Sequence, residues 1–436
     1  MKWLEHTAPT LEWRHPHQRY LCGYLREITA SRIRRSMIFM PPRHGKSEMV
    51  TIHYAAWRLI RDPRLNLIVA CYNQQLANRF SRRIRRIVSV CVELAADKTA
   101  VDEWETKAGG GVRAVGVGAG VTGFGASLVI IDDPIKGRAE AESVRRRNTA
   151  SEWFSDDIYT RLEPEAAIIL IQTRWHEDDL AGRLLKDDEG SGHWRVIKLP
   201  AIAEDGDALG RCCGEALWPE RFGIERLLDI KRQLGSYSFS ALYQQSPVPR
   251  DGEMFKREWF THIVAAAPKG LSWARGYDLA VSTRTTADHT ASFRCAFGPD
   301  GTLYIADGFR RRIKYPEQRK FVIERLFAER DTMHGIEQAL HGKALLQDLR
   351  RSQRSRASPL RAVRVDADKW TRALSWAPLA EAGKIALVQG GWIDEFIDEA
   401  CAFPNGEHDD QIDAVSIAVR MLAERKRAMY AFRGDR

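Results

Sequence analysis

A short run of residues near position 45 has the composition of a phosphate-binding loop. An apolar, strand-like stretch leads into Pro41 to Ser47 (PPRHGKS), and a helix-forming stretch follows immediately. Backbone N–H groups of such a loop, together with the positive end of the helix dipole, hold phosphates. In this arrangement Gly45 belongs to the loop, Lys46 reaches the β and γ phosphates of a triphosphate, and Ser47 ligates magnesium. Met40 stands where the P-loop pattern has its first glycine, so the entry to the loop must differ.

The second half of a nucleotide site requires a carboxylate at the end of a neighbouring buried strand. Asp132 and Asp133 directly follow the apolar run Leu128 to Ile131. Asp132 is predicted to hold the magnesium through water, as the acid of a Walker B motif does. Asp133 stands where many ATPases place a glutamate that orients the attacking water, and we interpret it as the base. Glu140 and Glu142 are alternatives for that role.

Further side chains are candidates for contacts with the nucleotide. Thr173 and Arg174 end another apolar run, a placement from which nucleic-acid motors sense the γ-phosphate and report its loss. Arg43, inside the loop, is the candidate charge stabiliser for phosphoryl transfer, as an arginine supplied in cis. Gln18, next to His17, is a candidate contact for adenine. Together these residues predict ATP and Mg²⁺ as the ligands of this half of the chain.

Four acidic residues in the second half are candidates for a shared metal site. Asp278 comes near the end of a strand-like segment, and Glu337 ends a second one after an intervening helix. Asp409 and Asp410 stand at the start of a helix whose apolar positions recur at helical spacing. Two carboxylates about 4 Å apart repel by about 4 kcal/mol at an effective dielectric near 20, so a buried set requires cations or protons. Two Mg²⁺ or Mn²⁺ ions would neutralise it and activate water at a phosphodiester.

The order of predicted elements divides the chain into two unlike halves. Up to residue 245, short apolar runs rich in β-branched residues alternate with helical stretches, which is typical of a mostly parallel sheet with crossover helices. The stretch 246–252 contains Pro and Gly and breaks all periodicity, so we expect a linker over 246–260. From 261 to 436, three strand-like segments precede a helix, a strand and another helix, which predicts a mixed sheet. The predicted fold class is therefore α/β.

Length and composition limit the classes of protein. At 436 residues the chain is long enough for two or three domains, and 44% apolar with 29% charged residues is ordinary for a globular protein. Lys+Arg 67 minus Asp+Glu 58 leaves a net charge of +9, which favours polyanions and nucleic acid above all. Seven scattered cysteines without CxxC spacing indicate reduced thiols in a cytosol rather than a zinc site. No apolar run approaches the roughly 20 residues of a membrane span, so we expect no membrane partner.

The ordered motifs resemble those of a terminase large subunit from a tailed phage or prophage, the DNA-packaging motor and nuclease. The resemblance covers nearly the whole chain. It rests on residues 41–47, 128–134, 173–176, 243–247 with Gly252, Phe255 and Trp259, and 408–414. It implies an N-terminal ASCE-type ATPase at 1–245, with a small lid segment at about 195–245. It also implies a C-terminal ribonuclease H-like nuclease at 261–436 that cuts concatemeric DNA.

The resemblance also implies roles for single residues. The phosphate, magnesium and coupling contacts would be Lys46, Ser47 and Thr173, and the metal-binding acids would be Asp278, Glu337 and Asp410. The chain departs from the family pattern at Asp133, where glutamate is usual. Its acidic doublet leaves both Asp409 and Asp410 eligible as the third metal ligand.

Partners follow from the same resemblance: double-stranded DNA, a portal protein, a terminase small subunit, and further copies of the chain in a ring on the portal. It implies the host cytoplasm as the location. Arginine clusters at 82–86, 145–147 and 310–312 are candidates for gripping DNA phosphates. From the residues alone, three other functions stay open: a helicase-type remodelling ATPase, a transposase- or resolvase-like nuclease with a vestigial P-loop, and a capsid scaffold without activity.

Overall fold

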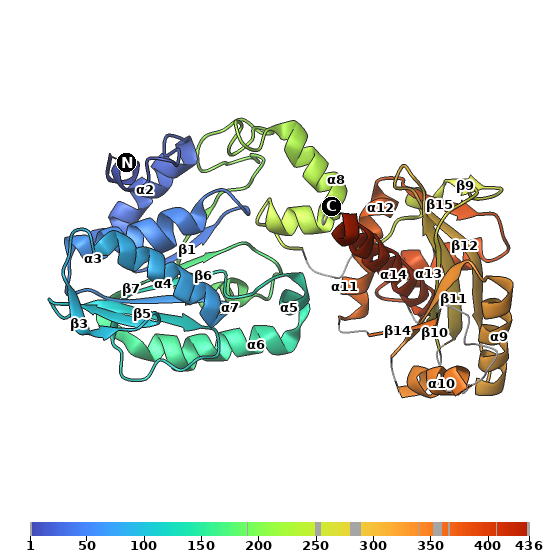
Figure 1. Ribbon diagram of the computed structural model, residues 1–436. Coiled ribbons are helices and arrows are strands. Elements are labelled where there is room, and N and C mark those ends of the chain that lie inside the picture. The colour runs from blue at the N-terminus through green and yellow to red at the C-terminus, as the bar shows by residue number, and fades with distance from the viewer. Residues whose placement is uncertain are drawn as a thin grey trace. The chain divides into compact units, whose positions relative to one another are not determined.

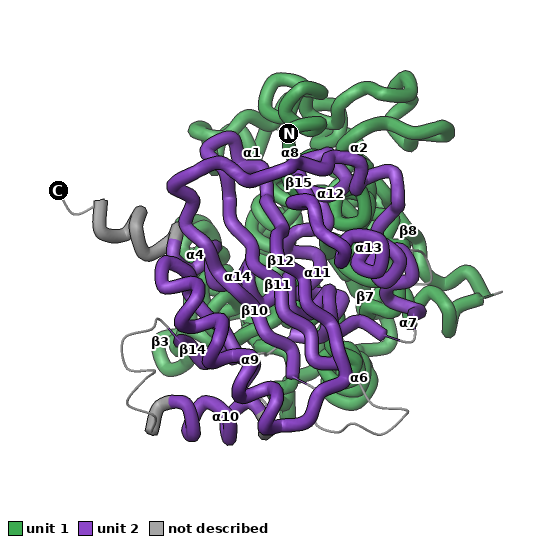
Figure 2. The backbone as a smooth tube through the Cα atoms, turned by 90° about the vertical axis from the view of Figure 1, so that its right-hand side faces the viewer, with its two compact units in different colours: residues 1–249 green, residues 250–436 purple. Residues whose placement is uncertain are grey.

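The chain divides into two compact units, residues 1–249 and 250–436, which are coloured separately in Figure 2. The computed structural model describes residues 2–189, 191–248, 254–279, 289–338, 340–351, 360–364, 367–406 and 408–433. Each unit contains its own sheet and its own core, so each is described by itself. The centre of the expected linker, residues 249–253, lies outside the described residues.

The first unit is built on an eight-stranded sheet with the order β3-β4-β5-β2-β6-β7-β1-β8. Strands β5, β2, β6, β7, β1 and β8 run parallel, and β3 and β4 form an antiparallel edge. Parallel neighbours end at the same edge of a sheet, so the residues after β1, β6 and β7 come together. The strands are β1 (Arg35–Phe39), β2 (Asn66–Cys71), β3 (Leu94–Thr99), β4 (Glu103–Thr106), β5 (Gly111–Gly116), β6 (Ala126–Asp132), β7 (Leu162–Gln172) and β8 (Arg195–Lys198).

Helices cover both faces of this sheet, because its strands are apolar on both sides. Along β6, Ile130 packs toward the face with α3 and α4, whereas Val129 and Ile131 pack toward the face with α6 and α7. Figure 1 shows α3 and α4 on one side and α6 on the other. The helical segments are α1 (Lys2–Thr7), α2 (Pro16–Thr29), η1 (Ser47–Tyr54), α3 (Ala55–Arg61), α4 (Gln74–Val88), α5 (Arg138–Glu142), α6 (Val144–Trp153), η2 (Phe154–Ile158), η3 (Tyr159–Arg161), α7 (Leu180–Asp187) and α8 (Ile224–Leu242).

Residues 199–245 form a small subdomain with a separate apolar cluster. Two isolated bridges join Ile202 to Ala216 and Trp218 to Phe222. The cluster consists of Ala201, Ala216, Phe222, Leu227 and Phe239. The preceding strand β8 pairs with β1 and so belongs to the main sheet.

The second unit contains a seven-stranded mixed sheet with the order β14-β13-β10-β11-β12-β15-β9. Strands β10, β11 and β12 are antiparallel neighbours, and β10 pairs in parallel with β13. The sequence predicted these three strands, the following helix and β13. The elements are η4 (Arg257–Phe260), β9 (Ile263–Val264), β10 (Trp273–Asp278), β11 (Thr290–Phe297), β12 (Leu303–Arg311), α9 (Tyr315–Ala328), β13 (Thr332–Glu337), α10 (Leu340–Arg351), β14 (Leu360–Val363), α11 (Lys369–Ala373), α12 (Ala377–Glu381), β15 (Ile385–Val388), α13 (Ile393–Ala402) and α14 (Asp410–Arg433).

Residues 254–260, which the sequence predicts to be linker, pack into this second unit. Phe255 is fully buried, and its ring stacks on Trp376 with centroids 4.3 Å apart. Phe260 is also buried and meets Phe396 edge to face. Aromatic side chains bury enough apolar area to hold this segment in the core, although its composition resembles that of a linker.

Helix α14 lies on one face of the second sheet and α9 on the other, as Figure 1 shows. The close approach of α14 depends on Gly276, because a Cβ atom there would lie 2.0 Å from the Ala414 carbonyl oxygen. Side chains two residues apart on a strand share a face. Asp278 therefore lies on the same face as Gly276, toward α14. The same alternation puts Glu337 on the face of Gly335, whose Cβ would meet Met421 of α14.

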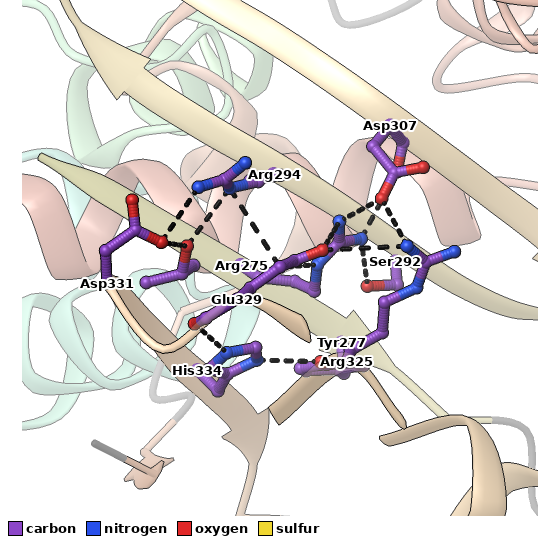
Figure 3. A network of polar contacts seen from close by, with 10 residues as sticks. Arg275, Tyr277, Ser292, Arg294, Asp307, Arg325, Glu329, Asp331 and His334 are labelled. Atoms are coloured by element: carbon purple, nitrogen blue, oxygen red, sulfur yellow. Dashed lines mark hydrogen bonds and ion pairs between the residues drawn. The ribbon is translucent and has the colours of Figure 1, made fainter. Parts of the chain in front are cut away.

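A buried polar network fixes β10 from the middle of the sheet (Figure 3). Arg275 is inaccessible to solvent, and its Nε and Nη2 donate to the two carboxylate oxygens of Glu329 at 2.8 and 2.7 Å. Nη2 also donates to Asp307 of β12 at 2.5 Å, and Nη1 to Ser292 of β11 at 3.2 Å. Three residues before Asp278, the network thus ties β10 to its neighbour β11, to β12 beyond it, and to the residue that follows α9.

Glu329→Ala is expected to lower the free energy of unfolding of the second unit by about 3 kcal/mol, because it leaves the buried Arg275 without its bidentate partner. Calorimetric or urea unfolding of the full chain measures this loss. The matched control is Glu324→Ala, which removes an exposed acid of α9 facing Lys320 at 4.0 Å and should change stability by no more than about 0.5 kcal/mol. Equal effects for both variants would contradict a structural role for the network.

Candidate active sites

The loop between β1 and η1 has the backbone geometry of an anion-binding turn. Arg43 and Gly45 have φ angles of 65° and 89°, which turn successive N–H groups inward before the helix begins at Ser47. Met40, in the place of the first glycine of the P-loop pattern, is buried in the core cluster beneath the loop. Its side chain anchors the loop entry by packing, which explains how the loop forms without that glycine.

Lys46 lies between the ends of two strands. Its ammonium contacts the Thr173 hydroxyl and is 3.1 Å from Asp133 Oδ2. Asp133 in turn accepts a hydrogen bond of 2.8 Å from the Thr173 backbone N–H. The structure therefore brings together three residues that the sequence separates by up to 127 positions. The physical reason is that β6, β7 and β1 are consecutive parallel strands that end at one edge.

Asp132 is buried beside two hydroxyl groups. Ser47 donates to its Oδ1 at 3.1 Å, and Thr51, one turn later in the helix, donates to its Oδ2 at 2.5 Å. Burial raises the pKa of Asp132 to about 7, and repulsion from Asp133 adds to this shift. Carboxylate and hydroxyl oxygens are the ligands that Mg²⁺ prefers, so this set fits the ion. Thr51 was not predicted from the sequence to be a site residue.

A cavity of about 930 Å³ opens above these residues. Its lining includes Gly45, Lys46, Ser47, Asp132, Asp133, Thr173, Arg43 and Gln18. Arg43 is exposed to solvent there. The Gln18 amide makes two hydrogen bonds to the segment before α2. It donates to the Glu12 carbonyl at 2.9 Å and accepts from the His15 N–H at 3.2 Å. Trp218, Glu220 and Arg221 from the small subdomain complete the wall and were not predicted from the sequence.

The acids near Asp133 differ in how they are held. Asp133 lines the cavity and has a φ of 45°. Glu142 is buried, 3.2 Å from Arg138 and 3.7 Å from His176. Glu140 accepts a hydrogen bond from the Lys136 N–H at 3.1 Å. Neither Glu140 nor Glu142 is among the described residues that line the cavity, so of these three acids only Asp133 faces it.

Arg174 does not face the cavity as expected of a γ-phosphate sensor. Its Nε donates to Asp179 at 2.8 Å, and its guanidinium lies over the Phe39 ring. Its backbone N–H donates to the side chain of Gln245 at 3.1 Å. The residue after Thr173 is therefore tied to the segment that follows α8. The reason is alternation: consecutive side chains beyond a strand end point to opposite sides, so only Thr173 reaches Lys46.

In the second unit, the structure brings Asp278, Glu337 and Asp410 together. Asp278 and Glu337 are the last residues of the parallel neighbours β10 and β13, and Asp410 is the first residue of α14. The pKa of Asp278 is raised well above its ordinary range, first by burial and then by repulsion from Asp413, Asp410 and Glu337. Burial and mutual repulsion disfavour the negative charges of these carboxylates unless cations are present. The set therefore fits divalent cations that prefer oxygen ligands.

Asp413 is a further acid of this cluster, for which no role was predicted from the sequence. It lies three residues after Asp410 on α14, so both share one helix face, and this spacing was the available signal. Asp413 is buried, and its carboxylate lies 2.9 Å from Arg372 and 3.5 Å from Lys369 of α11. Burial raises the pKa of Asp413 to about 7 in spite of these two cations.

The two members of the acidic doublet face different partners. Asp409 is partly exposed and accepts from Lys369 at 2.5 Å. Asp410 is buried and accepts from the His289 N–H at 3.1 Å. Repulsion from Asp410, but not from Asp409, is among the chief causes of the raised pKa of Asp278. The geometry thus favours Asp410 over Asp409 as the acid nearest Asp278.

Each arginine cluster uses at least one member for the fold, and in the first cluster Arg85 also donates to the Thr99 carbonyl at 2.8 Å. Arg83 pairs with Glu48, Arg147 with Asp178, and Arg310 with Glu395. The neighbouring arginines at 82, 86, 145, 146, 311 and 312 are partly or fully exposed. Only these remain candidates for DNA phosphates. None of the described helices is long and apolar enough to cross a membrane.

Two family descriptions match this chain. "Terminase large subunit, T4likevirus-type, N-terminal" matches residues 37–262, and "Terminase RNaseH-like domain" matches residues 275–422. No curated protein matches it. Among solved structures, it resembles the large terminase of a thermophilic bacteriophage. One crystal form is 11% identical, covering 90% of this chain and 94% of that one, with a TM-score of 0.56.

A second crystal form of that phage terminase is 10% identical, covering 90% of this chain and 95% of that one, with a TM-score of 0.53. Its complex with ATP-gamma-S is 12% identical, covering 89% and 93%, with a TM-score of 0.51. These likenesses confirm the predicted fold class. Because the N-terminal family description spans more than half of the chain and the nuclease description follows it, the chain belongs to the terminase large subunit family, with an ATPase domain and an RNaseH-like nuclease domain.

Proposed function

We propose that this chain moves double-stranded viral DNA into a procapsid by hydrolysing ATP, and cuts concatemeric DNA with two divalent ions. The observation that carries the proposal is the presence of two separate sites in one chain. One gathers Lys46, Asp132 and Asp133 around a cavity, and the other gathers Asp278 and Glu337 with α14. The motor is assigned to 1–245, with 199–245 as the lid, and the nuclease to the second unit.

In the ATPase site, Lys46 is the proposed phosphate contact. Oxygens of a bound triphosphate would replace Asp133 as the partner of the Lys46 ammonium. Asp133 would then be free to orient a water molecule. Ser47 and Asp132 would hold Mg²⁺, which would neutralise phosphate charge. The Thr173 N–H donates a hydrogen bond to Asp133, so Thr173 would move when Asp133 changes its partner. The next residue, Arg174, would pass this movement to Gln245 through its backbone hydrogen bond. Arg43 and Gln18 are the proposed charge stabiliser and adenine contact.

In the nuclease site, Asp278, Glu337 and Asp410 are the proposed ligands of two Mg²⁺ or Mn²⁺ ions. Such ions would activate a water and stabilise the leaving oxygen of a phosphodiester. Arg372, 3.8 Å from Glu337 and ion-paired with Asp413, would hold Asp413 in place and offset part of the negative charge. Asp409, paired with Lys369, is the proposed outer acid rather than a ligand.

The proposed partners are duplex DNA, a portal protein, a terminase small subunit and further copies of the chain in a ring on the portal, in the host cytoplasm. The exposed arginines would grip DNA through phosphates, because a packaging motor must hold any sequence. Incubating the full chain with supercoiled plasmid and Mn²⁺, and separately with ATP, tests the double assignment. A helicase-type protein would hydrolyse ATP without cutting, and a transposase-like nuclease would cut without hydrolysing ATP.

Asp133→Asn is expected to lower ATP turnover at least about a hundredfold while leaving ATP affinity within about threefold, since only the water-orienting carboxylate is lost. Asparagine tolerates the positive φ of this position, so the loop should keep its shape. Turnover by phosphate release and binding by a fluorescent nucleotide check the two parts. Glu140→Gln is the matched control and should turn over normally. Full activity of Asp133→Asn would contradict the assignment.

A further inference from the structure

Two histidines lie beside Asp410, outside the acid set described above. His289 immediately precedes β11, and His408 lies two residues before α14 begins. One possible ligand atom from each of His289, His408 and Asp410 lies within 4.8 Å of the others. The two imidazole rings are perpendicular, with centroids 4.7 Å apart. Residues separated by more than a hundred positions therefore present two nitrogens and a carboxylate to one point.

One ring nitrogen of each histidine is not used by the fold within the described residues. His289 Nδ1 is 3.7 Å from Asp410 Oδ2, which is too long for a hydrogen bond. Within the described part of the chain, His289 Nδ1 and His408 Nδ1 are buried and have no hydrogen-bond partner. Ligand atoms that share one ion at about 2.0–2.2 Å are themselves about 3–3.6 Å apart. The 3.7 Å between His289 Nδ1 and Asp410 Oδ2 is thus close to the separation of two ligands of one cation, and all three ligand atoms lie within 4.8 Å of one another.

The backbone helps to hold this arrangement. The His289 N–H donates to Asp410 Oδ2 at 3.1 Å, so the carboxylate and the histidine move together. The nearby positive charge of Arg310 is compensated by Glu395 and by Glu399, whose carboxylate is 3.3 Å away. A cation next to Asp410 therefore meets less repulsion than the arginine cluster alone would cause.

We propose that His289 and His408 join Asp410 to form an imidazole-bearing position for a divalent transition cation at the nuclease site. Imidazole ligands suit Zn²⁺, Co²⁺ or Fe²⁺, whereas the all-oxygen set of Asp278 and Glu337 suits Mg²⁺ or Mn²⁺. The imidazole-bearing position is therefore expected to differ in metal selectivity from the positions that the acids provide for Mg²⁺ or Mn²⁺. This inference rests on the proposed nuclease site in one respect, because Asp410 belongs to both sets.

The test is titration of the full chain with Co²⁺ alone, without DNA or nucleotide, followed by calorimetry and by the visible absorption of Co²⁺. His289→Asn and His408→Asn should each weaken the histidine-dependent binding step at least about tenfold. His262→Asn, an exposed histidine of the same unit, is the control and should change nothing. All variants retain the seven cysteines, so binding at thiols cancels. Melting temperatures in EDTA verify that each variant is folded.

The outcomes separate this inference from the proposed function. Unchanged Co²⁺ affinity in both histidine variants would overturn the imidazole site, even if Mg²⁺-dependent cleavage proceeds through the acids. Conversely, Asp278→Asn should reduce cleavage about a hundredfold or more and leave the histidine-dependent Co²⁺ step within about threefold of wild type. If Asp278→Asn still cuts DNA while the histidine variants lose Co²⁺ binding, the proposed nuclease chemistry fails and the metal site stands.

Discussion

Replacing Lys46 with alanine is expected to lower the ATP turnover of the full chain at least about a hundredfold. The Lys46 ammonium is buried at the floor of the cavity, between Asp133 and Thr173, where no other described lysine contacts both strand ends. A charge held in a site shielded from water stabilises developing phosphate charge far better than a solvated one. The loss should appear in the rate of phosphate release at saturating ATP.

Lys136→Ala is the matched control for this measurement. Lys136 lines the same cavity, but its side chain is exposed and its backbone N–H is held by Glu140. Its removal should leave turnover within about threefold, because an exposed ammonium is screened. If Lys46→Ala hydrolyses ATP at the wild-type rate, the loop is only a structural turn. If the wild-type chain does not hydrolyse ATP on its own, the three proteins are compared in the same assay with portal protein added.

Asp278→Asn is expected to reduce metal-dependent plasmid cleavage by about a hundredfold or more. Asp278 lies among the other acids of the cluster, because Asp413, Asp410 and Glu337 all repel its negative charge. An amide cannot supply the negative charge that two divalent ions require, so metal affinity and water activation both fall. Gel assays with Mn²⁺ measure the effect. Asp394→Asn, which changes an exposed acid of α13 in the same unit, should cut normally.

The same substitution should raise the stability of the metal-free protein. Because the pKa of Asp278 is higher in the folded than in the unfolded chain, folding favours its protonated form. Protonated Asp278 therefore stabilises the folded chain at pH values below the pKa that Asp278 has in the unfolded chain. This contribution is lost as the pH rises toward the pKa that Asp278 has in the folded chain. In EDTA at neutral pH, the second unit of Asp278→Asn should therefore melt at a higher temperature than wild type, and its melting temperature should fall less between pH 5 and 8.

A substitution that lowers activity but raises stability, as expected for Asp278→Asn, is typical of a functional site. Melting curves in EDTA and in Mn²⁺ distinguish it from a general effect of the substitution, because Mn²⁺ should stabilise the wild type more than the variant. A metal-free melting temperature below that of wild type would contradict the crowding of charges around Asp278. The Asp394→Asn control should follow the wild-type pH dependence, because its side chain is exposed.

The sequence by itself determined the local chemistry of both sites. The loop around Lys46, and the acids at the ends of β6, β10 and β13, were found because each follows a recognisable apolar strand. Parallel strands that end at a common edge make such residues neighbours whatever the rest of the fold does. The order of these motifs along the chain was also enough to indicate the family.

Tertiary structure alone decided which neighbouring side chains join each site. Arg174 was expected at the nucleotide but pairs with Asp179, and the segment around Phe255 was expected to be linker but is core. Asp413 and His289 reach the nuclease acids only because α14 packs against Gly276 and brings its first turn to the end of β10. Such contacts depend on how a helix docks on a sheet. That docking is set by packing between residues far apart in the chain, and no local pattern encodes it.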